Sequence, residues 1–138
     1  MTSLALSPLV GSLYVALGGA VGAVARYQLG RAVTHIAGPN TGFPWATLSA
    51  NIIGSLAMGL LAGWLARHTS GGESSEALRL LIGVGLLGGF TTFSAFSLEM
   101  MLLIERGSSA LAFSYALVSV VAGLAALYIG LVAMRGAA

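Results

Sequence analysis

The chain has 138 residues, of which 57% are hydrophobic and 7% are charged, and its mean hydropathy is +0.95. A soluble domain carries roughly 25% charged residues, and six Arg with four Glu cannot cover the surface of a small soluble globule. The composition therefore excludes an ordinary soluble domain, a disordered chain and, since no basic cluster is present, a nucleic-acid-binding protein. The absence of cysteine excludes disulfides and thiolate chemistry.

Four apolar stretches are long enough to cross a membrane, because a helix needs about 20 apolar residues to span roughly 30 Å of hydrocarbon. In chain order they cover residues 8–25, 43–66, 80–98 and 109–134, with connections at 31–42, 67–77 and 105–108. The stretches are continuously apolar rather than alternating, which favours helices over strands. We therefore predict an all-α membrane protein in which residues 1–138 form a single four-helix transmembrane domain.

Small residues recur four positions apart in three of the spans, a pattern that lets helix backbones approach closely in lipid. They are Gly18 with Gly22, Ser55 with Gly59 and Gly63, and Gly85 with Gly89. The pattern predicts helix packing rather than a binding site. Four short helices enclose little interior, which favours a transport pathway built from two subunits.

The arginines that flank the spans are evenly divided between the two sides of the membrane. With four spans, one side carries Arg67, Arg79 and Arg135, and the other carries Arg26, Arg31 and Arg106. The positive-inside rule then gives almost no preferred orientation. Two copies inserted in opposite directions could pair about an axis in the membrane plane, unless one arginine outweighs the others.

The second span carries Thr47, Asn51 and Ser55 at spacings that place them on one helical face. Polar side chains at this depth are costly and usually mark a pathway or a contact between helices. Asn51 offers two N–H donors and one acceptor. Both interpretations, pathway and interhelical hydrogen bonding, stay open from this helix alone.

The third span contains the segment GGFTTFSAFS at residues 88–97. Two glycines followed by two threonines are poor material for a continuous helix, and a break would free backbone carbonyls that need a partner inside a membrane. A cation is one such partner, since hard cations bind oxygen. Phe93 and Phe96 lie on nearly the same face, and the positive edges of their rings can favour a small anion. Packing against lipid is the alternative role for both rings.

The fourth span presents Tyr115 and Ser119, again on one face, and both can donate hydrogen bonds. Glu99 is the only acid near the membrane interior, and it lies toward the end of the third span, while Arg26 ends the first. A proton-coupled transporter is expected to carry a central titratable acid. The donors and ring edges instead indicate an uncharged path for an anion.

Three segments together resemble the Fluc-type bacterial fluoride channels: GGAVGAVARY at 18–27, TLSANIIGS at 47–55 and GGFTTFSAFS at 88–97. The resemblance covers all four spans, and the third segment is its specific part. It implies a fluoride-selective passive channel, not an enzyme, in the cell (inner) membrane. It further implies an antiparallel, dual-topology homodimer surrounded by membrane lipid, with two fluoride pores.

The resemblance also implies roles for individual residues. The aromatic box around fluoride would be Phe93 and Phe96, and the polar contacts of the pore would be Asn51, Tyr115, Ser119, Thr47 and Ser94. A structural sodium ion, which is not transported, would be held at the third-helix break by the backbone carbonyls of Gly88 and Thr91 of each subunit.

Four further positions complete the comparison with that family. Arg26 looks like its first-helix arginine and Glu99 like its third-helix carboxylate, and we assign neither a definite role. The sequence departs from the family's pattern at Ala95, where threonine is usual, and at Gly123, where some relatives have a pore serine.

Two other functions fit four spans with balanced charge. A small multidrug-type cation antiporter would need a carboxylate in the middle of the first span, which this sequence lacks. A non-transporting membrane subunit would use the glycine faces as contact surfaces for a partner complex.

Overall fold

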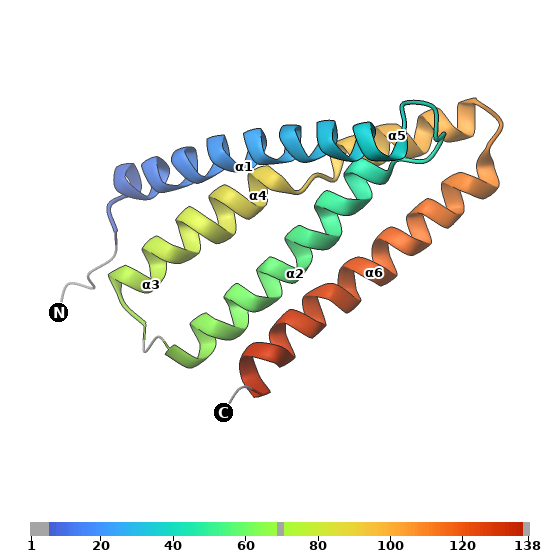
Figure 1. Cartoon of the computed structure of the whole chain (residues 1–138). Helices are drawn as coiled ribbons and strands as arrows, with labels where there is room; N and C mark the ends of the chain where they lie inside the picture. Colours follow the sequence, from blue (N-terminus) through green and yellow to red (C-terminus); the bar gives the residue numbers. More distant parts are fainter. Residues whose placement is uncertain (1–5, 69–70, 137–138) are drawn as a thin grey trace.

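The computed structural model describes residues 6–68 and 71–136, which form helices joined by connections (Figure 1). Within this part, four helical segments are long and apolar enough to cross a membrane. The predicted all-α, four-span architecture is therefore confirmed. Residues 1–5 and 137–138 of the predicted domain, and residues 69–70 of the second connection, lie outside the described part. The elements are α1 (Pro8–Ala37), α2 (Trp45–His68), α3 (Glu73–Leu78), the π-helix η1 (Arg79–Leu87), α4 (Gly88–Phe90), α5 (Ser94–Glu105) and α6 (Ser109–Gly136).

Helix α1 extends well beyond its apolar run. It begins where the Ser7 side chain accepts a hydrogen bond from the backbone N–H of Val10 (3.3 Å) with Pro8 at the first helical position. The prediction that the first connection starts at Arg31 is wrong, because the helix continues through Ala37. Charged residues end a hydrophobic stretch without ending a helix. The helix stops at Gly38, whose φ of 88° is one that favours glycine, and Pro39 follows.

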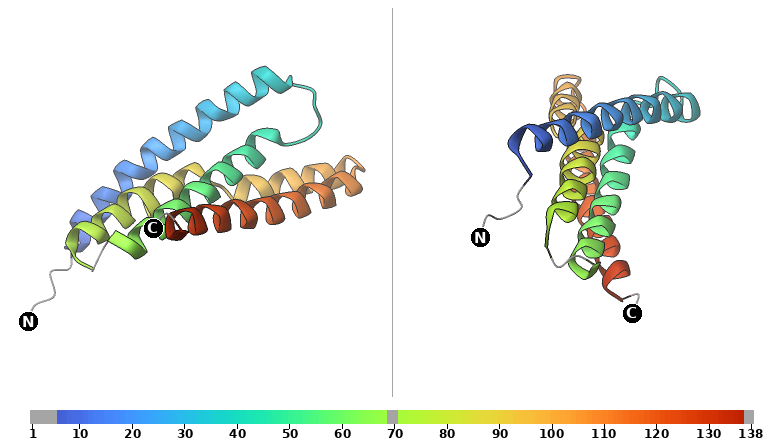
Figure 2. Two further views of the ribbon diagram at one scale, coloured as in Figure 1. Left: turned by 60° about the horizontal axis from the view of Figure 1, so that its bottom comes forward. Right: turned by 90° about the vertical axis from the view of Figure 1, so that its left-hand side faces the viewer.

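The helices pack as two close pairs. Helix α1 packs mainly on η1 and α4, and α2 packs mainly on α6. Figure 2 shows α1 diverging from the other helices toward its C-terminal end. The predicted small-residue packing is confirmed: a Cβ on Gly22 would overlap the carbonyl oxygen of Leu86, and one on Gly59 would overlap that of Leu127. Both contacts therefore require glycine.

The third span is interrupted, as predicted. Helix α4 ends at Phe90, Thr91 is extended (φ −86°, ψ 161°), and α5 starts at Ser94. Within the break, the Thr92 hydroxyl accepts a hydrogen bond from the N–H of Ala95 (3.2 Å), which stabilises the new helix start. The two glycines before the break remain helical, and the wide π-helical turns of η1 were not predicted.

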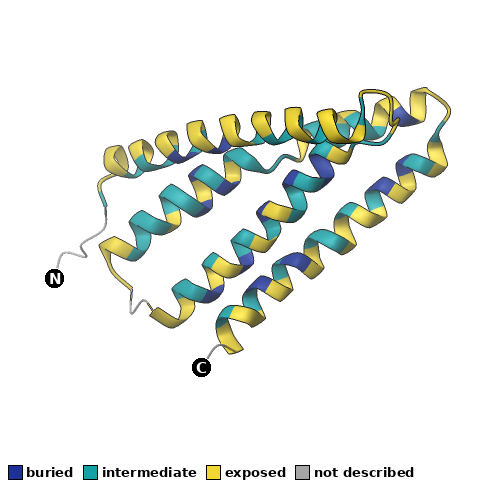
Figure 3. Ribbon diagram, viewed as in Figure 1, coloured by how far each residue is buried: buried dark blue, intermediate teal, exposed yellow. Residues whose placement is uncertain are grey.

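Many large apolar side chains of the single chain are exposed, as expected for a protein whose solvent is lipid (Figure 3). A small buried cluster lies where α2, α5 and α6 meet, and its members are Leu48, Leu103, Ala112 and Tyr115. Tyr115 is fully buried. This cluster packs the last turn of α5 against the first turns of α2 and α6 and so fixes the position of α5 relative to both helices.

Candidate functional site

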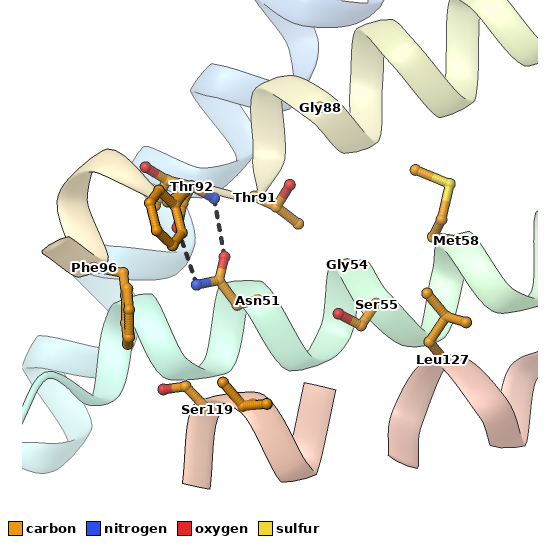
Figure 4. Close-up of a pocket in the computed structure, with 12 residues that line it drawn as sticks. Asn51, Gly54, Ser55, Met58, Gly88, Thr91, Thr92, Phe96, Ser119 and Leu127 are labelled. Carbon is orange, nitrogen blue, oxygen red and sulfur yellow. Dashed lines mark hydrogen bonds between the residues drawn. The ribbon is translucent and has the colours of Figure 1, made fainter. Parts of the chain in front are cut away.

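The break in the third span is held by one side chain of the second span. Asn51 donates through Nδ2 to the carbonyl of Thr92 (3.1 Å), and its Oδ1 accepts from the N–H of the same residue (2.9 Å). Figure 4 shows both bonds. A primary amide can form such a two-bond pair with the N–H and C=O of one residue only in this orientation. Asn51 therefore acts here as an interhelical clamp, and its second N–H is left for another acceptor.

The two carbonyls predicted to face a cation have lost their usual helical partners. In a continuous helix, the N–H of Thr92 would bond to the carbonyl of Gly88, and that of Ala95 to the carbonyl of Thr91. These N–H groups bond instead to the side chains of Asn51 (2.9 Å) and Thr92 (3.2 Å). The break therefore leaves the expected pair of backbone oxygens free of their helical bonds.

A cavity of about 480 Å³ lies beside the break, and we call it the break cavity. Phe93 and Phe96 border it with ring centroids 5.8 Å apart, which agrees with the prediction that they share a face. The hydroxyl of Ser119 is buried and has no hydrogen-bond partner among the described residues. The lining residues are Asn51, Gly54, Ser55, Met58, Gly88, Thr91, Thr92, Phe93, Phe96, Ser119, Val120 and Leu127 (Figure 4).

A second cavity of about 440 Å³, the arginine cavity, lies on another side of the break. The half-buried Arg26 reaches it because this residue continues the helical row of Gly18 and Gly22 past the point where α1 packs on α4. Thr92 borders both cavities. The lining residues are Arg26, Gly30, Ala46, Thr47, Thr92, Ser94, Ala95 and Leu98. Four of the five polar residues predicted for the pore therefore fall into two cavities that share Thr92: Asn51 and Ser119 border the break cavity, and Thr47 and Ser94 border the arginine cavity.

Glu99 occupies the centre of a hydrogen-bonded group that joins three helices. Its Oε1 accepts from the hydroxyl of Thr47 (2.7 Å) and its Oε2 from the hydroxyl of Tyr115 (2.8 Å). Tyr115 lines neither the break cavity nor the arginine cavity, and its ring packs against those of Phe96 and Phe43. In the described part of the chain, Arg26 and Glu99 form no ion pair.

Because Tyr115 belongs to this hydrogen-bonded group, we expect removal of its hydroxyl to lower stability more than removal of the hydroxyl of Tyr128, another tyrosine of α6. Replacing Tyr115 with phenylalanine removes a donor to Glu99 from a buried position, and we expect a loss of about 1 kcal/mol in stability. Tyr128→Phe removes the same hydroxyl from a side chain that is 68% exposed, and we expect no change. Thermal unfolding of the two purified variants in detergent measures the difference, and equal midpoints would contradict the role given to the Tyr115 hydroxyl.

Thr92 has a central position that was not predicted from the sequence. Its backbone is clamped by Asn51, its hydroxyl caps α5, and it borders both cavities. Thr91, by contrast, directs its hydroxyl to the carbonyl of Leu87 (2.8 Å), as threonines in helices do. The only available signal was the Thr-Thr pair after two glycines, which does not distinguish one threonine from the other.

These features define a multi-pass helical membrane protein with an interrupted third span and polar cavities at the interruption. A family described as CrcB-like protein, Camphor Resistance (CrcB), matches residues 13–131. The chain therefore belongs to this family.

Similar proteins carry a consistent name. A protein of Novosphingobium aromaticivorans called "Fluoride-specific ion channel FluC" is 61% identical over 125 residues, covering 91% of this chain and 96% of that protein. Proteins with the same name from Sphingopyxis alaskensis (56% identical; 88% of this chain, 92% of that protein) and Erythrobacter litoralis (52%; 94% and 96%) are also similar. The resemblance proposed from the three sequence segments is confirmed, and the names describe channels rather than enzymes.

Proposed function

We propose that this protein is a fluoride-selective passive channel. The observation that carries the proposal is the break cavity, where two phenylalanine rings, the Asn51 amide and the unpaired Ser119 hydroxyl come together beside an interrupted helix. The names of the similar proteins support the choice of ion. The lining residues contain no acid that would repel an anion.

The chemistry of this cavity suits a small anion. Fluoride holds its water tightly, so a selective path must replace that water with donors in a bore too narrow for larger halides. The second N–H of Asn51 and the hydroxyl of Ser119 are donors, and ring edges carry partial positive charge. Phe93 and Phe96 therefore stabilise the ion without a fixed charge that would trap it.

The proposed channel is a homodimer of two oppositely oriented copies in the cell membrane. The even division of arginines supports insertion in both directions. Phe93 supports a second copy: its side chain borders the break cavity, yet 79% of it is exposed in the single chain. A second subunit packed on this side would enclose the ring and close the pathway.

A structural sodium ion at the subunit interface forms part of the proposal. The carbonyls of Gly88 and Thr91 have lost their helical partners to the side chains of Asn51 and Thr92. Free carbonyl oxygens suit a hard cation, and an unpaired carbonyl inside a membrane is otherwise costly. Two antiparallel copies would each supply this pair, and the ion would hold the break in shape without being transported.

Passive transport is sufficient for export. In acidic surroundings, fluoride enters cells as neutral HF, which dissociates inside. The fluoride ion is then trapped, because a charge crosses lipid poorly. An inside-negative potential then drives the anion outward by about 2.3 kcal/mol per charge per 100 mV. Neither a nucleotide nor a proton gradient is required.

Efflux from liposomes tests the proposal. Purified protein in liposomes loaded with fluoride should release it when a potassium ionophore dissipates the charge, while chloride-loaded liposomes should retain their content. Phe96→Ile should slow fluoride release at least tenfold, because it removes the ring edge from the cavity. Phe113→Ile, on a side chain of α6 that is 75% exposed, is the matched control and should conduct normally.

Two results would contradict the proposal. Equal release of chloride and fluoride by the unmodified protein would show that the channel is not selective for fluoride. Normal fluoride release by Phe96→Ile would show that the Phe96 ring is not needed for conduction.

A further inference from the structure

A groove of about 690 Å³ lies at the C-terminal end of α1, and we call it the basic groove. Two adjacent helical rows of α1 form it, and Gly30 leaves its floor open because it has no side chain. The start of α2 and the first connection form the other wall. The lining residues are Arg26, Gly30 and Thr34 from one row, Tyr27, Arg31 and His35 from the next, and Pro39 and Ala46.

The charge of the basic groove is not compensated by an acidic residue in the described part of the chain. No acidic residue lines it, and within residues 6–68 and 71–136 the ion pair present joins Arg79 to Glu76 at a different part of the molecule. The guanidinium of Arg31 lies 6.0 Å from the centre of the Tyr27 ring, a cation–π contact that fixes its direction and uses none of its N–H donors. Arg26 and Arg31 are therefore free to bind an anion.

The position of the groove along α1 corresponds to the membrane interface. Arg31 lies roughly 33 Å along the helix axis from Leu9 at 1.5 Å per residue, and the hydrocarbon core is roughly 30 Å thick. Between these points, an exposed apolar row follows the helix and ends at Tyr27 and Arg31. Its members are Leu13, Leu17, Val21 and Val24, each of them 56–63% exposed. Tyrosine and arginine at the end of such a row are typical of the headgroup level.

We propose that the basic groove binds the headgroup of an anionic phospholipid. The phosphodiester accepts hydrogen bonds from the guanidinium of Arg31, with Arg26 in the adjacent row of α1, and an acyl chain lies along the exposed row of α1. A guanidinium suits this role because its planar array of donors matches two phosphate oxygens. The exposed apolar row beside the groove favours a lipid over free phosphate as the ligand. A phosphate ion would contact only the arginines, whereas the acyl chain of a lipid would also cover the apolar row. The inference does not depend on fluoride conduction.

Native mass spectrometry of the delipidated, detergent-purified protein tests the inference. Phosphatidylglycerol and phosphatidylcholine are titrated separately, and bound lipids are counted. We expect a clear preference for phosphatidylglycerol in the unmodified protein. Arg31→Gln should weaken that binding about fivefold, the usual effect of one arginine at a charged membrane surface, while Arg31→Lys should lose less. Arg135→Gln, at an exposed arginine near the end of α6, is the matched control and should change binding less than twofold.

Three results would overturn the inference: equal binding of the two lipids by the unmodified protein, unchanged phosphatidylglycerol binding by Arg31→Gln, or displacement of phosphatidylglycerol by millimolar inorganic phosphate. The lipid comparison on the unmodified protein decides the matter even if Arg31→Gln does not fold. Fluoride efflux by Arg31→Gln is measured in parallel and should be normal. If Arg31→Gln loses lipid binding but keeps normal fluoride efflux, the two proposals concern separate sites. If the unmodified protein binds the lipid but releases no fluoride, the lipid site stands and the proposed function fails.

Discussion

Replacing Asn51 with leucine is expected to reduce fluoride efflux at least a hundredfold and to lower stability by about 2–6 kcal/mol. The substitution removes both bonds to the backbone of Thr92 and leaves an N–H and a C=O without partners. Each such group costs about 1–3 kcal/mol when it is buried. It also removes the remaining amide N–H from the break cavity. Efflux from liposomes and thermal unfolding in detergent measure the two effects.

Two further variants separate clamping from conduction. Asn51→Asp keeps an oxygen that can accept from the Thr92 N–H, so we expect it to fold better than the leucine variant. It still loses the donor and places an acid in the break cavity, so conduction should remain low. Asn40→Ala, at an exposed asparagine in the first connection, is the matched control and should change neither measurement. A leucine variant that conducts normally would refute the role of this amide.

Two neighbouring glycines of α1 should respond very differently to alanine. A Cβ on Gly22 would overlap the Leu86 carbonyl oxygen and lie 2.9 Å from the Phe90 backbone nitrogen, so backbones rather than flexible side chains must move. We expect a loss of about 3 kcal/mol or more. Gly19→Ala is the matched control: its Cβ would meet nothing closer than the Gly85 carbonyl at 3.9 Å. That variant should be neutral or gain about 1 kcal/mol from helix propensity.

Thermal unfolding and the yield of monodisperse protein in detergent measure this pair. Equal midpoints for the two variants would show that α1 can move away from α4 at no cost. Because Gly22 lies one turn before Arg26, separation of the two helices at this point should also widen the arginine cavity. A fall in fluoride efflux for Gly22→Ala without loss of folded protein would reveal such a change.

The spans and the break were predictable because their signals are local. Continuous apolarity over about 20 residues identifies a spanning helix, and the residues GGFTT disfavour a continuous helix. The same local reasoning started the first connection too early, at Arg31, because charge marks the limit of a hydrophobic stretch while Gly38 and Pro39 mark the limit of the helix.

The partners of the polar residues were not predictable, because they depend on how helices distant in sequence align. Tyr115 and Ser119 share one face of α6, yet the first bonds to Glu99 and the second lines the break cavity. One helical turn is about 5.4 Å of axial distance, which is enough to move from one neighbouring helix to another. Thr47 and Asn51 likewise share one face of α2 but have different partners, because Thr47 bonds to Glu99 and Asn51 bonds to Thr92.

The two-bond pair between Asn51 and Thr92 has one more consequence. A side-chain amide that is free to rotate would need to be reoriented, at an entropic cost, each time an ion arrives. Here the backbone N–H and C=O of Thr92 determine which end of the amide is nitrogen and which is oxygen, because the opposite assignment would set donor against donor and acceptor against acceptor. The remaining N–H therefore points in one direction before any ligand is present. In the proposed channel, a passing ion would meet a dipole that is already aligned, and it would leave again without the amide having to relax.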